Sequence, residues 1–181
     1  MRVITGLARG RRLRTLEGED IRPTTEKVKE AVFSILQFEI EGRTVLDLFA
    51  GSGQMGIEAL SREAKRVVFV DSSAKSLKVV KDNLETTGLG GSATVVASDF
   101  RSYLSSCGER FDIVFLDPPY SKGFIPVAMP LIEKLLNKGG AAVCETSSNE
   151  ELPEEFGELK KASVKRYGKI SVTIYRHKDV I

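Results

Sequence analysis

The sequence predicts an α/β fold with a mostly parallel sheet and an antiparallel strand at its C-terminal end. Short apolar runs alternate with stretches of helical periodicity along most of the chain, as they do when helices connect parallel strands. One run leads into Gly51, Gly53 and Gly56, whose spacing is that of the glycine-rich turn in doubly wound sheets. Residues 170–174 instead alternate between apolar and polar side chains, which is typical of an antiparallel strand.

In the first half of the chain we expect three helices that alternate with two strands. Pro23 keeps Arg22 extended, and a threonine after it can cap a helix with Glu26 near its positive end. An apolar stripe continues this helix to Leu36. The elements that follow are a strand over 44–49, a helix over 54–62, a strand over 66–70 ended by Asp71, and a helix capped by Ser72 or Ser73.

In the second half, apolar runs predict three more parallel strands before a closing antiparallel pair. We expect strands over 93–97, 111–116 and 141–145, a short helix around Tyr103, a helix over about 125–137, and paired strands over 159–167 and 170–176. Pro130 predicts a kink or a later start in the longer helix, and Gly139 and Gly140 should end it. The acidic stretch 147–157 reads as a surface loop or short helix.

Length and composition predict one soluble domain. The chain has 181 residues, of which 41% are hydrophobic and 29% charged. No apolar run approaches the roughly 18 residues of a membrane span, and we recognise no signal peptide. Two isolated cysteines are too few for a disulfide framework, and with a single histidine the sequence has no Cys/His group with the spacing of metal ligands. We therefore expect a cytoplasmic, monomeric protein that binds neither a membrane nor a metal.

Positive charge is concentrated at the N-terminus. Residues 1–14 hold five arginines and no acid, while the whole chain has a net charge of only +2. The segment is either a solvated basic tail or an element that contacts phosphates, for which the guanidinium fork is well shaped. We expect a hairpin or arm over 1–20 and the main domain over 21–181. The expected RNA-binding residues are Arg9, Arg11, Arg12, Arg14 and Arg22.

Acidic side chains stand at successive strand ends. Asp47 lies inside the first strand, just before the glycine turn. A pyrophosphate needs no carboxylate at this place, whereas a cationic ligand would be bound by one. Asp71 and Asp99 follow at the next two strand ends. Each aspartate alone could be a loop cap, but three in succession favour a binding edge. A second motif, Asp117-Pro118-Pro119-Tyr120, follows the apolar run 111–116 and so should lie at the same edge.

The two motifs in this order resemble the S-adenosylmethionine-dependent amino-methyltransferases. The resemblance implies a sulfonium cofactor whose methyl group is already activated. Asp47 would reach its ammonium group, Asp71 its ribose hydroxyls, and Asp99 with Phe100 would border the adenine. The expected cofactor-binding residues are Thr24, Asp47, Phe49, Gly51, Ser52, Gly53, Asp71, Ser72, Asp99 and Phe100.

The Asp117–Tyr120 motif suits an exocyclic amine, whose lone pair is delocalised into the base. The Asp117 carboxylate and the Pro118 carbonyl would accept its two N–H bonds, while Pro118 and Pro119 fix the backbone. Tyr120 would stack on the flipped base. A proline-rich turn with a core tyrosine is the alternative. The motif does not distinguish adenine N6, cytosine N4 and guanine N2.

Longer stretches resemble the RsmD family of bacterial 16S ribosomal RNA guanine-N2 methyltransferases. The resemblance lies in residues 4–13, in Arg22-Pro-Thr-Thr and the residues after it to Phe33, in 47–53 and in 57–62. It implies a Rossmann-like class I fold with a small N-terminal β-hairpin. It also implies methylation of one guanine N2 in 16S rRNA on the small ribosomal subunit. Gln54 and Met55 depart from the smaller residues expected there.

Other functions remain open at this point. The nearest alternative is an amino-methyltransferase that acts on adenine N6 or cytosine N4 of another nucleic acid, or on a protein amide. A nucleotide-dependent oxidoreductase and a non-catalytic RNA-binding module are more remote. The chain has no room for the target-recognition domain that a DNA enzyme usually carries, which favours an RNA substrate.

Overall fold

A computed structural model describes residues 1–16 and 23–180, without the side chains of Pro23 and Thr24. In this part of the chain an eight-stranded sheet has the order β3-β2-β1-β4-β5-β8-β7-β6. The strands are β1 Thr44–Asp47, β2 Arg66–Asp71, β3 Ala93–Ala97, β4 Phe111–Leu116, β5 Leu136–Ser147, β6 Glu155–Phe156, β7 Leu159–Tyr167 and β8 Ile170–His177. Strands β1 to β5 are parallel, whereas β8 pairs antiparallel with both β5 and β7.

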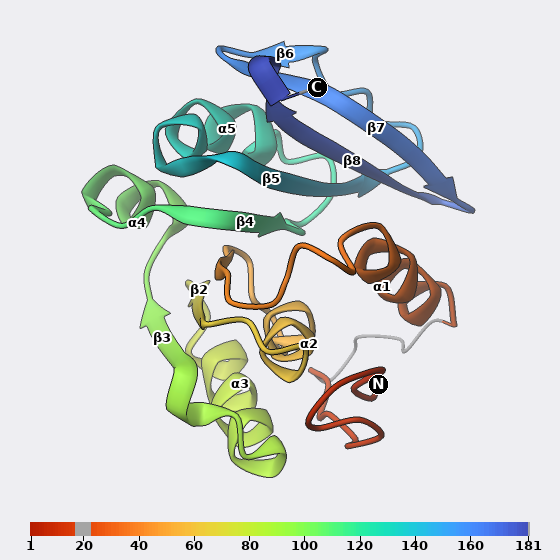
Figure 1. Ribbon diagram of the computed structural model, residues 1–181, viewed down its shortest axis with the longest axis vertical. Coiled ribbons are helices and arrows are strands. Elements are labelled where there is room, and N and C mark those ends of the chain that lie inside the picture. Colours follow the sequence, from red (N-terminus) through yellow and green to blue (C-terminus); the bar gives the residue numbers. More distant parts are fainter. Residues whose placement is uncertain (17–22, 181) are drawn as a thin grey trace.

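Helices cover both faces of the sheet (Figure 1). They are α1 Pro23–Ile35, α2 Gln54–Ser61, α3 Ala74–Thr87, α4 Phe100–Ser106 and α5 Phe124–Leu135, with short 3₁₀ turns at Gly90–Ser92 and Lys178–Val180. One buried cluster joins α1, α2 and α3 to the sheet, and a second joins α4 and α5 to the other face. None of the helices in the described residues has the length and apolar character of a membrane span.

The two-residue alternation of each strand explains this layering. Val45 and Phe69 belong to the cluster under α1 to α3, whereas Leu46 and Val68 belong to the one under α4 and α5. Strands that are buried on both faces need apolar side chains at nearly every position, which is why they appear in the sequence as continuous apolar runs. Most of the expected helices and strands are confirmed, and β3 has the predicted bounds, Ala93–Ala97.

The α5–β5 junction differs from expectation. The helix α5 begins at Phe124, earlier than predicted, and continues through Pro130 to Leu135. The strand β5 then starts at once, because buried Leu136 pairs with Phe111. Gly139 and Gly140 lie within β5 at an irregularity in its pairing with β4, instead of ending the helix. A Cβ at Gly140 would come within 2.6 Å of the Asp112 carbonyl oxygen, so glycine allows the close approach of the two strands.

The N-terminal segment is packed against the domain. An antiparallel bridge joins Arg2 to Arg12, and Val3, Ala8 and Leu13 are buried in the same cluster as α1 to α3. Figure 1 shows the segment beside α2. The solvated-tail interpretation is therefore wrong for residues 1–16. The division at residue 20 stays a prediction, because residues 17–22 lie outside the described part of the chain.

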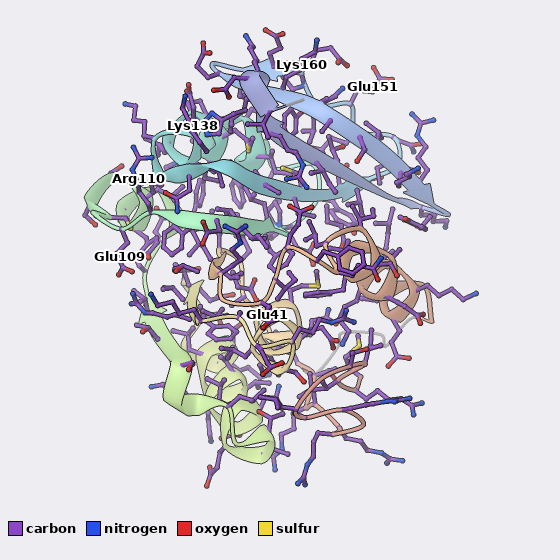
Figure 2. The ribbon with its side chains drawn as sticks, viewed as in Figure 1. Glu41, Glu109, Arg110, Lys138, Glu151 and Lys160 are labelled. Atoms are coloured by element: carbon purple, nitrogen blue, oxygen red, sulfur yellow. The ribbon has the colours of Figure 1, made fainter. Side chains whose placement is uncertain are left out.

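The amino-terminal edge of the sheet lies away from the predicted site. Figure 2 labels charged residues that precede or begin β1, β4 and β5 at that edge: Glu41, Glu109, Arg110 and Lys138. The predicted residues of the two motifs, with Asp71 and Asp99, instead lie at or just after the carboxyl ends of β1 to β4. In open parallel sheets, ligands bind outside that second edge.

Candidate active site at the carboxyl edge of the sheet

A cleft of about 820 Å³ lies at the carboxyl edge of the sheet. This volume is within the usual range for small-molecule sites. Most of the residues that the sequence predicted for cofactor and base line it: Asp47, Phe49, Gly51, Ser52, Asp71, Ser72, Asp99, Phe100, Asp117, Pro118, Pro119 and Tyr120. Gly53 lies behind the turn against Val80. The Thr24 side chain is outside the described residues, but the neighbouring Thr25 also lines the cleft.

Strand register places four carboxylates along this edge. Asp47 pairs with Phe69 of β2 and with Phe115 of β4, so Asp71 and Asp117 lie two residues further out. Leu116 pairs with Cys144, so Glu145 follows directly beside Asp117. All four acids line the cleft. Among the described residues, however, no three His, Cys, Asp or Glu side chains converge closely enough to hold a metal ion.

Asp47 is the deepest of these acids. Its side chain is only 4% exposed, and its Oδ2 accepts the N–H of Gly56 in the first turn of α2 at 2.9 Å. Burial raises the pKa of Asp47 to about 7; the Gly56 N–H works against this rise and the nearby Asp71 adds to it. The protein thus compensates the Asp47 charge only in part, and a cation in the cleft would complete the compensation.

Hydrogen bonds to the Asp71 carboxylate fix the glycine turn in place. Asp71 Oδ2 accepts the Gly51 N–H at 2.9 Å, and its Oδ1 accepts the Ser73 N–H at 2.8 Å. Gly53 has a φ of 80°, a conformation in which glycine avoids the strain of a side chain. A Cβ at Gly56 would come within 2.3 Å of the Phe69 ring, so the third glycine lets α2 pack closely on β2. The turn is thereby fixed at the mouth of the cleft.

Aromatic rings form one wall of the cleft. Phe49 lies 5.1 Å from Phe100 and 6.0 Å from Phe124, measured between ring centroids, and its ring is nearly parallel to that of Phe124. Asp99 caps α4 by accepting the N–H groups of Arg101 and Ser102 at 2.9 and 3.3 Å. That cap fixes the start of α4, where Phe100 projects into the wall, so Asp99 serves the fold whether or not it touches a ligand.

The Asp117–Tyr120 corner faces the cleft. Asp117 is exposed there, while Pro118 is buried and anchors the turn. The Tyr120 ring is 39% exposed, and its hydroxyl donates to Glu145 Oε1 at 2.7 Å. Burial raises the pKa of Glu145, and the Tyr120 hydroxyl partly offsets this rise. The tyrosine therefore lies at the cleft surface, and a core tyrosine is not what the structure shows.

Comparison with known proteins decides the family. The chain matches the family described as "Conserved hypothetical protein 95" over residues 1–176. The chain belongs to this family. It is 40% identical to "Putative rRNA methyltransferase YlbH" of Bacillus subtilis, across 97% of this chain and 98% of that protein. It is 35% identical to "Ribosomal RNA small subunit methyltransferase D" of Haemophilus influenzae, across 98% and 94% of the two chains. The predicted RsmD family is thus confirmed.

A solved structure in this group has the same fold. "Putative methyltransferase yhhF from Escherichia coli" superposes with a TM-score of 0.88 at 32% identity, and the match covers 98% of this chain and 97% of that one. The predicted class I methyltransferase fold, with its antiparallel C-terminal strand, is confirmed by this similarity and by the strand order.

Sequence reasoning missed several residues of this family member's cleft. Glu145 ends the strand predicted over 141–145, so the rule that singled out Asp47 and Asp71 could have found it. Phe124 joins the aromatic wall as the first residue of α5. Met1 and Leu16 reach the cleft from the N-terminal segment, which no local sequence signal indicated.

The predicted RNA-binding arginines lie on the N-terminal segment. Arg9, Arg11 and Arg12 are exposed. Arg14 is also largely exposed, and its guanidinium lies 3.0 Å from the Asp82 carboxylate on α3. Arg22 lies outside the described residues. The segment thus carries charge at the surface on one side and contributes to the cleft on the other.

Proposed function

We propose that this chain transfers a methyl group from S-adenosylmethionine to the exocyclic N2 amine of one guanine in 16S rRNA of the small ribosomal subunit. The proposal depends on one observation: a single cleft contains both the rigid Asp117–Tyr120 corner and Asp47, whose negative charge the protein compensates only in part. The names of the relatives support the substrate, since the Haemophilus influenzae protein is a small-subunit rRNA methyltransferase.

The residues of the cleft fit this cofactor. Asp47 offers a buried carboxylate to a cationic amino-acid end, and the glycine turn permits close approach of that end to the backbone. Asp71 lies at the next strand end, where its carboxylate can accept from ribose hydroxyls. Phe49, Phe100 and Phe124 provide an apolar wall for an adenine ring. When bound, the cofactor supplies an electrophilic methyl group on a sulfonium.

The Asp117–Tyr120 corner orients the acceptor amine. The Asp117 carboxylate and the Pro118 carbonyl can each accept one N–H of the amine, which localises the nitrogen lone pair toward the donor. Since proline fixes φ at Pro118 and Pro119, these acceptors cannot drift apart. Tyr120 stacks on the flipped base and helps to exclude water. The arginines of the N-terminal segment contact RNA phosphates outside the cleft.

Methyl transfer to isolated particles tests this proposal. Purified protein is incubated with isotopically labelled S-adenosylmethionine and with small-subunit particles from cells that lack the enzyme, and the RNA nucleosides are analysed by mass spectrometry. We expect label in N2-methylguanosine, at no more than one site per particle. Label in N6-methyladenosine or N4-methylcytosine would contradict the guanine assignment, and absence of transfer would contradict the activity. Asp117→Ala serves as the inactive control.

A further inference from the structure

We propose that Glu145 selects guanine by accepting the N1–H of the flipped base while Asp117 holds its N2 amine. This inference rests on the proposed function, since it concerns how the same cleft distinguishes guanine from the other bases that carry an exocyclic amine. It assigns a recognition role to a residue that the glycine and Asp117–Tyr120 motifs do not include.

Glu145 is placed beside Asp117 by the sheet itself. Because Leu116 of β4 pairs with Cys144 of β5, the next residues along the two parallel strands are neighbours. Leu116 and Cys144 both point into the cluster under α4 and α5, so the alternation turns the following pair toward the opposite face. Glu145 and Asp117 both line the cleft. Two carboxylates therefore stand side by side where the base must lie.

The bases differ at the ring position next to the amine. In guanine, the N2 amine adjoins N1–H, so neighbouring atoms present donors. In adenine and cytosine, the amine adjoins a ring nitrogen that carries a lone pair. A second carboxylate beside Asp117 would accept from guanine N1–H, and it would repel the lone pair of the other two. The chemistry of two adjacent acceptors thus matches guanine alone.

The Tyr120 hydroxyl orients Glu145 and leaves most of the acceptor positions of the Glu145 carboxylate for other hydrogen bonds. It donates to Oε1 at 2.7 Å, and an ionised carboxylate can accept about four hydrogen bonds. Tyr120 also carries the ring proposed to stack on the base, so one contact fixes the stacking platform and the recognition group relative to one another. Glu145 is half-buried at the cleft, so it can be reached by a base while water competes less for its carboxylate than at an open surface.

Replacing the target guanine by 2-aminopurine tests the inference. This analogue keeps the 2-amino group but lacks N1–H and also O6, so the part of the preference that changes in the Glu145 variants reports on N1–H. Particles are reconstituted with either base at the guanine that the wild-type protein methylates. We expect wild type to favour guanine over 2-aminopurine by about 10- to 100-fold in kcat/KM. We expect Glu145→Ala to reduce this preference to about threefold or less. Glu145→Gln should retain an intermediate preference, since its carbonyl can still accept.

A Tyr120→Phe background separates direct recognition from positioning. This variant keeps the ring and removes the hydroxyl that contacts Glu145. If Glu145 contacts the base, Glu145→Ala lowers the guanine preference in both backgrounds. If it has no effect in Tyr120→Phe, Glu145 acts only through Tyr120 and the inference is wrong.

The failure of this inference is distinguishable from failure of the proposed function. If wild type methylates guanine N2 but Glu145→Ala keeps the full preference for guanine over 2-aminopurine, the recognition role is wrong and the activity stands. If wild type places no methyl group on guanine N2, the proposed function itself fails. Cofactor affinity, measured by calorimetry, should be the same in wild type and Glu145→Ala, which shows that the variant is folded.

Discussion

Two buried carboxylates, Glu58 on α2 and Asp47 at the end of β1, have contrasting surroundings. Glu58 is fully buried, and it accepts the N–H groups of Ile4 and Thr5 at 2.8 and 3.1 Å as well as Arg62 Nε at 2.9 Å. Asp47 is almost as buried, but it lines the cleft and its pKa is raised to about 7. The protein satisfies the first carboxylate internally and leaves the second in need of a partner.

Four side chains around Glu58 bind the N-terminal segment. We call this set the dock; it consists of Lys29, Glu58, Ser61 and Asn83. Lys29 Nζ donates to the Arg2 carbonyl at 2.7 Å, and the Ser61 hydroxyl donates to the Thr5 carbonyl at 2.6 Å. Asn83 accepts the Arg14 N–H at 2.7 Å and donates to the Ser52 carbonyl at 2.9 Å. The dock therefore links the N-terminal segment to the glycine turn of the cleft.

We infer from this difference that the paired group stabilises the fold, whereas the partly compensated group serves the proposed ligand. Buried polar groups that are fully paired within the protein are costly to disrupt, because each broken pair leaves an unsatisfied partner. Carboxylates that face a cavity with incomplete compensation add little stability, and can reduce it, until a ligand arrives. Substitutions in the dock should therefore lower stability, while those in the cleft should lower activity or binding.

Asp117→Ala should have the largest effect. It removes the acceptor proposed to orient the amine, so kcat on small-subunit particles should fall by about 1,000-fold, as when other preorganised polar contacts to a reacting group are lost. The midpoint of thermal unfolding should change little, since Asp117 lies exposed at the cleft. Transfer assays and thermal denaturation measure the two effects. Turnover close to wild type would contradict the acceptor role.

Glu58→Gln should lower the free energy of unfolding by about 3 kcal/mol, because it removes the charge opposite Arg62 and Lys29 in a fully buried site. Urea denaturation measures the loss. Glu85→Gln on the exposed side of α3 is the matched control, and it should stay within about 0.5 kcal/mol of wild type. Cofactor affinity of the folded fraction should be unchanged. Equal effects of the two substitutions would show that the Glu58 carboxylate contributes no more to stability than an exposed one, which would contradict the role given to the dock.

Asp47→Asn should weaken S-adenosylmethionine binding by about tenfold, since a neutral amide attracts the ammonium less strongly. It should also change how stability depends on pH. The folded pKa of Asp47 is raised from 3.8 to about 7, so folding favours the protonated form. The wild-type protein therefore loses stability from Asp47 as pH rises from about 4 to 7, and the variant lacks this loss. Thermal unfolding of both proteins across that range tests the sign, and parallel profiles would contradict it.

Replacing Arg9, Arg11 and Arg12 by glutamine should have the smallest effect at physiological salt. Loss of three phosphate contacts should lower the slope of log affinity against log salt by about 2. Charge substitution is a cleaner test than truncation, which would remove buried Val3, Ala8 and Leu13. Lys138→Gln and Lys160→Gln, at the positions labelled in Figure 2 away from the N-terminal segment, are the controls. An unchanged slope would show that the arginines do not contact RNA phosphates.

The sequence was most informative where the physical signal is local. Buried parallel strands read as apolar runs, so β1 to β4 and the residues that follow them could be placed, and with them Asp47, Asp71 and Asp117. The dock could not be predicted, because Glu58 contacts Ile4 and Thr5 across more than fifty residues of chain. The start of β5 was missed because Gly140 allows a close strand contact that only the pairing with β4 reveals.

Calorimetric titration of the wild-type protein tests most directly whether the cleft is built for a positively charged methyl donor. Titration with S-adenosylmethionine should give saturable binding at one site per chain, while titration with NAD, the ligand of the related dinucleotide folds, should give none. Saturable binding of NAD, with no heat from S-adenosylmethionine, would contradict the account.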